Sequence, residues 1–76
     1  MTGVEKMTVS YKKLWKLLID RDMRKKDLRE AAGFSTSTMS KLASNENVSM
    51  DVLVKLCNTL DVDISDIMEI MPEKTM

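Results

Sequence analysis

The sequence predicts a compact, all-α domain of five helices. Among its 76 residues proline occurs once and glycine twice, so few positions oppose a helix. Apolar residues recur at the i, i+3, i+4 and i+7 spacing of amphipathic helices, and strict two-residue alternation, the mark of a half-buried strand, does not compete with them. The helices are expected at 11–22, 25–32, 36–44, 50–60 and 64–71.

Each expected helix start carries a hydrophobic staple, in which an apolar residue before the N-cap packs on another in the first turn. The staple pairs are Val9 with Leu14, Met23 with Leu28, Phe34 with Met39, Val48 with Leu53, and Val62 with Ile67. The N-caps between them are Ser10, Arg24, Ser35, Ser49 and Asp63. Ser and Asp accept a hydrogen bond from a free amide of the first turn, so only Arg24 is a poor cap.

Chain length and composition indicate a single folded domain. Apolar residues make up 43% of the chain and charged residues 32%, a balance typical of globular proteins. We expect a flexible segment at 1–8, the domain at 9–71 and a tail at 72–76. Nine residues are expected at the centre of the core: Trp15, Leu18, Leu28, Phe34, Met39, Leu42, Leu53, Leu56 and Leu60.

The composition argues against an enzyme. There is no histidine, the single cysteine is Cys57, and no glycine-rich phosphate loop occurs, so the usual nucleophile, zinc and nucleotide sites cannot be assembled. We therefore expect no catalytic residue, metal, cofactor or small-molecule ligand, and interpret Cys57 as a buried structural thiol. No leader-like start or membrane-length apolar run is present, which predicts a cytoplasmic protein.

The net charge of zero conceals a division along the chain. Residues 10–45 carry nine Lys or Arg against four Asp or Glu, a balance of +5. Residues 46–76 carry two against seven, a balance of −5. By itself, this division fits two interpretations equally well. One is a basic binding module with an acidic second half, and the other is a set of charged helix faces that only contact solvent.

Only three residues, Gly33, Phe34 and Ser35, join the second and third expected helices. Glycine adopts the left-handed conformation that ends a helix without steric cost, so Gly33 predicts a sharp corner there. Two short helices joined by such a corner are typical of a helix-turn-helix.

The segment KKDLREAAGFSTSTMSKLAS, from Lys25 to Ser44, resembles the helix-turn-helix of the lambda-repressor-like, or Cro-type (XRE), transcriptional regulators. The family's apolar and glycine positions are occupied by Leu28, Ala32, Gly33, Phe34, Met39 and Leu42. The resemblance covers residues 9–71 and is greatest to short, one-domain bacterial members carried on mobile or glycopeptide-resistance elements. Arg29 departs from the family, which commonly has alanine there, and so does Lys25, where glutamine is common.

The resemblance implies a sequence-specific regulator that binds double-stranded operator or promoter DNA and inserts the helix at 36–44 in the major groove. It assigns base contacts to Thr36, Ser37 and Lys41. Their residue types fit, because small hydroxyl side chains let a helix enter the groove and lysine reaches guanine. A merely solvated face is the alternative interpretation.

The first turn of the second expected helix is basic, although the helix dipole favours negative charge there. A DNA phosphate held by these cations and the free amides would account for it, and ordinary sequence tolerance is the alternative. The expected phosphate contacts are Arg24, Lys25, Lys26, Ser35, Ser40 and Asn45.

The expected last helix has more apolar residues than one stripe requires, which predicts a homodimer through it unless it merely closes the core. The expected interface residues are Ile64, Ile67, Ile70 and Met71. The alternative function is an antitoxin-type or protein-interaction module with the same fold. Zero net charge favours this alternative, and the basic residues at 24–26 disfavour it.

Overall fold

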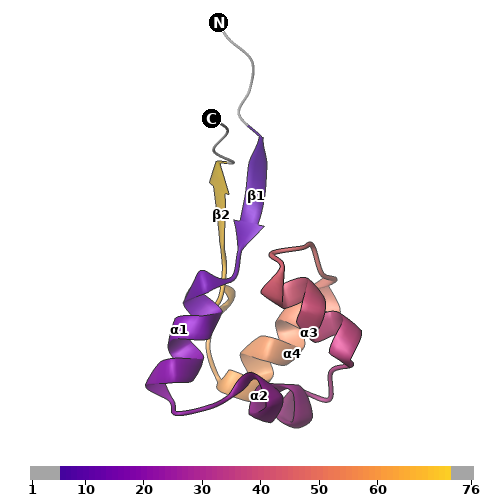
Figure 1. Ribbon diagram of the computed structural model, residues 1–76. Helices are drawn as coiled ribbons and strands as arrows, with labels where there is room; N and C mark the ends of the chain where they lie inside the picture. The colour runs from indigo at the N-terminus through magenta and orange to yellow at the C-terminus, as the bar shows by residue number, and fades with distance from the viewer. Residues whose placement is uncertain (1–5, 73–76) are drawn as a thin grey trace, which may run out of the picture.

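A computed structural model describes residues 6–72, in which four α-helices form a body and a two-stranded antiparallel hairpin projects from it (Figure 1). In chain order the elements are β1 (Met7–Ser10), α1 (Lys12–Asp20), α2 (Lys25–Ala32), α3 (Thr36–Ala43), α4 (Met50–Leu60), the 3₁₀ turn η1 (Ile64–Asp66) and β2 (Glu69–Pro72). None of the helices in this part of the chain has the length and apolar character needed to span a bilayer.

The first four predicted helices are confirmed, but the expected cap Ser10 is wrong, since it lies in β1 and Tyr11 is the N-cap of α1. Serine caps explain where α3 and α4 begin. The Ser35 Oγ accepts a hydrogen bond from the Thr38 N–H at 3.2 Å and starts α3. The Ser49 Oγ accepts from the Val52 N–H at 3.3 Å and starts α4. These bonds satisfy amides that have no partner inside the helix.

The predicted fifth helix is wrong, and with it the all-α class. Asp63 caps the segment as expected, since its Oδ1 accepts from the Ile64 N–H at 2.9 Å, but only the turn η1 follows. The chain then extends as β2, because its backbone groups pair with β1 rather than with the preceding turn. The fold is therefore a helical body with a small β-hairpin.

The hairpin joins segments near the two ends of the described chain. Its register places Val9 opposite Ile70 and Met7 opposite Pro72, so these four apolar side chains share one face. The strands include residues 7 and 8, which were expected in the flexible first segment, and residue 72, which was expected in the tail. The rest of the expected ends, residues 1–5 and 73–76, lie outside the described residues.

The core lies between the helices and includes seven of the nine residues expected there. Trp15 and Met39 are corrections, since both are only partly buried and pack against the core from outside. The buried apolar residues are Val9, Tyr11, Leu14, Leu18, Leu28, Phe34, Leu42, Leu53, Leu56, Leu60 and Ile67. Strand β1 and turn η1 thus contribute Val9 and Ile67 to the same core as the helices.

Candidate nucleic-acid interface

A sharp corner at Gly33 sets the positions of α2 and α3. Gly33 has φ +74°, and its N–H donates to the Arg29 carbonyl at 2.9 Å, followed by the Phe34 N–H at 3.0 Å. A Cβ at this position would meet no atom within 4 Å, so the backbone conformation, and not crowding, requires glycine. The buried Phe34 ring then anchors the corner in the core.

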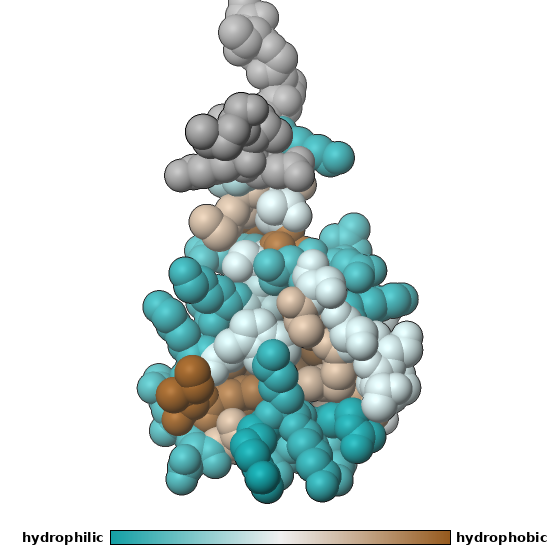
Figure 2. Space-filling view, viewed as in Figure 1, coloured by the Kyte–Doolittle hydropathy of each residue, from teal (hydrophilic) through white to brown (hydrophobic). Residues whose placement is uncertain are grey.

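Helix α3 turns a hydroxyl-rich surface to solvent. Thr36, Ser37 and Lys41, the expected base contacts, are all exposed, while Leu42 is fully buried on the opposite side. Figure 2 shows a nearly white surface over α3, the intermediate hydropathy of Ser and Thr, beside strongly hydrophilic side chains over α2. The structure therefore presents all three residues together on one accessible face.

The first turn of α2 combines three cations with one carboxylate. Arg24 is the N-cap, and its backbone N–H donates to the Asp27 Oδ2 at 2.9 Å while its Nε lies 3.6 Å from the same oxygen. That backbone hydrogen bond is the main reason why the pKa of Asp27 lies below its usual value. Asp27 thus supplies the negative charge that the dipole favours, and Lys25 and Lys26 remain exposed beside it.

Lys25 contacts an aromatic ring that sequence reasoning had placed in the core. Its Nζ lies 4.6 Å from the centroid of the Trp15 ring on α1. Such a cation–π contact contributes about 0.5–1 kcal/mol at an exposed site. Trp15 therefore orients one of the expected phosphate contacts, a role that no local sequence pattern indicates.

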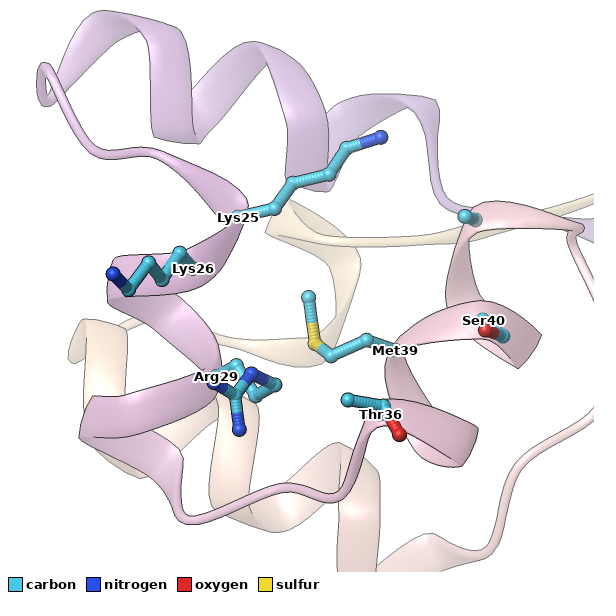
Figure 3. A pocket seen from close by; sticks show the side chains of 7 residues that line it. Lys25, Lys26, Arg29, Thr36, Met39 and Ser40 are labelled. Atoms are coloured by element: carbon cyan, nitrogen blue, oxygen red, sulfur yellow. The ribbon is translucent and has the colours of Figure 1, made fainter.

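A shallow groove of about 300 Å³ separates α2 from α3 (Figure 3). Met39 extends from α3 into this space, which explains why it is only partly buried. The α2 side carries Lys25, Lys26 and Arg29, and the α3 side carries Thr36, Ser40 and Ala43. Arg29 was not among the expected contacts, yet it lies across the groove from Thr36.

Tyr11 fixes the loop that follows α3. The Oδ1 of Asn45 accepts from the Tyr11 N–H at 3.1 Å, and the Tyr11 hydroxyl donates to the Glu46 carbonyl at 2.7 Å. Burial of the ring raises the pKa of Tyr11. Asn45, an expected phosphate contact, therefore has its side-chain oxygen engaged, and its side-chain NH₂ is the part left to donate a hydrogen bond. Similarly, Ser35 uses its hydroxyl oxygen to cap α3.

The expected contacts differ in how the structure holds them. Five of them lie at the α2 N-terminus or line the groove: Arg24, Lys25, Lys26, Thr36 and Ser40. Asn45 lies beyond α3, in the loop that Tyr11 fixes. Of the expected dimer residues, Ile67 is fully buried and Ile64 is partly buried, so neither presents an interface as a helix would have done.

This combination of a Gly33 corner, an accessible α3 face and a basic α2 start defines a helix-turn-helix domain. The sequence model of the Cro/C1-type HTH DNA-binding domain matches residues 13–73. The chain belongs to this family of DNA-binding domains, as its resemblance to Cro-type regulators predicted.

Among solved structures, the chain is similar to the crystal structure of the transcriptional regulator VanUg. The two are 56% identical and superpose with a TM-score of 0.88, over 96% of this chain and 97% of that one. A search of curated proteins gave no match.

Proposed function

We propose that the protein is a sequence-specific regulator of transcription that inserts α3 in the major groove of double-stranded DNA. The observation that carries this proposal is the exposed face of α3, where Thr36, Ser37 and Lys41 stand together above a buried Leu42. Hydroxyl groups can donate to or accept from base edges, and a lysine can reach the O6 and N7 of guanine. Similarity to VanUg supports a role in transcription.

Phosphate contacts are assigned to residues around the α2 N-terminus, in and beside α3, and in the loop after it. Lys25 and Lys26 are exposed cations in the first turn of α2, where the backbone amides have no acceptor within the helix, an arrangement that attracts an anion. Arg24, with a side chain 81% exposed, Ser35, Ser40 and Asn45 complete this group. Such contacts fix the position of the protein on DNA without reading its sequence.

Removing the two groups of contacts is expected to change DNA affinity in different ways. Lys25→Ala or Lys26→Ala should weaken binding to operator and random DNA alike, and should flatten the dependence of log K on log salt by about one unit for each lost phosphate contact. Thr36→Ala, Ser37→Ala or Lys41→Ala should cost about 1–3 kcal/mol mainly on the operator. Salt titrations of fluorescence anisotropy with both DNAs measure these effects.

Lys55→Ala is the matched control, because Lys55 is an exposed cation on α4, outside the helix-turn-helix. It should bind like the unsubstituted protein. If all five interface variants also do so, the DNA surface lies elsewhere and the interaction-module alternative gains support. If Lys41→Ala loses the same binding free energy whichever bases the operator carries, Lys41 contacts the DNA backbone.

We also propose a homodimer, with the hairpin in place of the missing fifth helix. Ile70 is 56% exposed and Met7 is 53% exposed, and both lie on the apolar face of a ribbon that projects from the helical body (Figure 1). A two-stranded hairpin is marginally stable by itself, so covering this face with the same face of a second copy would stabilise both. Two copies would present two α3 helices to an operator with two half-sites.

A further inference from the structure

Arg29 is a cation for which the described part of the chain supplies no ion pair. The one ion pair within residues 6–72 joins Arg24 to Asp27. Arg29 is nevertheless partly buried, in the third position after Lys26 along α2. The aliphatic stem of an arginine can be covered by its neighbours while its guanidinium stays accessible to an anion.

The groove beside Arg29 has the charge and shape of a site for a polyanion backbone. Its lining includes three cations and no acidic side chain. Residues 25 and 29 are four apart, so Lys25 and Arg29 lie on one face of α2, with Lys26 adjacent. Met39 and Ala43 give the groove an apolar floor, which suits the carbon face of a deoxyribose, while the cations suit its phosphates.

Arg29 occupies the end of this groove nearest the α3 face. In Figure 3 it lies across from Thr36, the first residue of α3, whereas the Lys25 side chain extends away from Arg29, towards the other end of the groove. A DNA strand that passes from the α2 N-terminus towards Thr36 would therefore meet Lys25 first and Arg29 last. Guanidinium groups bind phosphate through two parallel hydrogen bonds.

We propose that the α2–α3 groove binds one segment of DNA backbone, and that Arg29 is the phosphate-binding residue at the end of the groove next to Thr36. The inference rests on the proposed DNA-binding function and adds to it a contact and an occupant for the groove. It requires that Arg29 contribute the same binding free energy for every DNA sequence, since a phosphate carries no base identity.

Arg29→Met tests the proposal, because methionine keeps an apolar stem in the groove and removes the guanidinium. At 0.1 M salt it should weaken binding to operator and random DNA by about eightfold each, the loss that corresponds to a change of about 0.9 in the salt slope. Arg29→Lys should retain the slope, and Lys55→Met, which removes a cation from α4, should leave both affinities unchanged. Thermal unfolding of each variant shows whether the fold is intact.

Three results would overturn the proposal. The first is that Arg29→Met binds both DNAs as tightly as the unsubstituted protein and with the same salt slope, since Arg29 would then contact no phosphate. A loss confined to the operator would make Arg29 a base contact. If Lys25→Ala and Thr36→Ala weaken binding while Arg29→Met does not, the proposal for Arg29 fails and the proposed DNA-binding function stands. If the unsubstituted protein binds no DNA, both the proposal for Arg29 and the proposed function fail.

Discussion

The hydroxyl of Tyr11 connects the start of α1 to the loop after α3. It donates to the Glu46 carbonyl at 2.7 Å, from a ring that is almost fully buried. No sequence signal pointed to this role, because the two residues are 35 positions apart and the bond depends on the folded arrangement of helices. The helix expected at 11–22 includes Tyr11 only as its first residue.

Tyr11→Phe should lower the free energy of unfolding by about 1 kcal/mol at neutral pH, since it removes the hydrogen bond and keeps the ring. The pKa of Tyr11 in the folded protein is raised above 10.0, so its contribution is complete below about pH 10 and is lost as the pH rises further. Urea melts of both proteins at pH 8 and at pH 10.5 measure the difference. A difference that stays constant, or grows, at the higher pH would contradict this assignment.

Single residues also show why two core predictions failed. Periodicity places Trp15 and Met39 on inward-facing stripes, and both do lie against the core. Each is left partly exposed where α2 approaches, Trp15 beneath Lys25 and Met39 in the groove. A period of 3.6 residues identifies the inner face of a helix but does not show where a neighbouring helix stops covering it.

Among the elements, local signals predicted the starts of α2, α3 and α4 and the Gly33 corner, whereas α1 begins one residue later than expected, after Tyr11. Helix ends were less visible: Asp22, Asn45 and Asp61 adopt φ values of +55° to +60° after α1, α3 and α4, where the sequence offers no glycine. Asp and Asn tolerate this conformation better than most residues, but they are also common in loops and so gave no distinct signal.

The hairpin was missed because its pairing is non-local. The spacing of Ile64, Ile67 and Met68 is correct for the single turn η1, and Ile67 is fully buried as a result. Beyond it, short apolar runs fit a strand as well as a helix, and only the partner strand at residues 7–10 decides between them. That partner lies about sixty residues earlier in the chain.

Ile70→Lys should weaken self-association if the apolar face of the hairpin forms the dimer contact, because a charge would then be buried at the interface. Sedimentation over a range of protein concentrations measures the association. Ile19→Lys is the control, since Ile19 is 75% exposed on α1, away from the hairpin. An unsubstituted protein that stays monomeric at high concentration, with and without DNA, would exclude the dimer.

In the whole molecule, the basic and acidic halves of the chain form different parts of the fold. Three cations from the basic half line the groove between α2 and α3, while the acidic second half includes α4, η1 and β2. The sequence could predict the helix-turn-helix and the exposed residues of α3, because both depend on local spacing. It could not predict the groove, the position of Arg29 or the contact of Lys25 with Trp15, because these depend on how separate helices pack.

The central claim is that the exposed face of α3 reads a DNA sequence. Its most direct test is the affinity of the purified protein for double-stranded DNA from upstream of its own gene, measured in competition with random DNA at fixed salt. We expect binding to be at least about 10³-fold tighter to the specific fragment, as is typical of sequence-specific regulators. Equal affinity for both DNAs, or no binding to either at low salt, would contradict it.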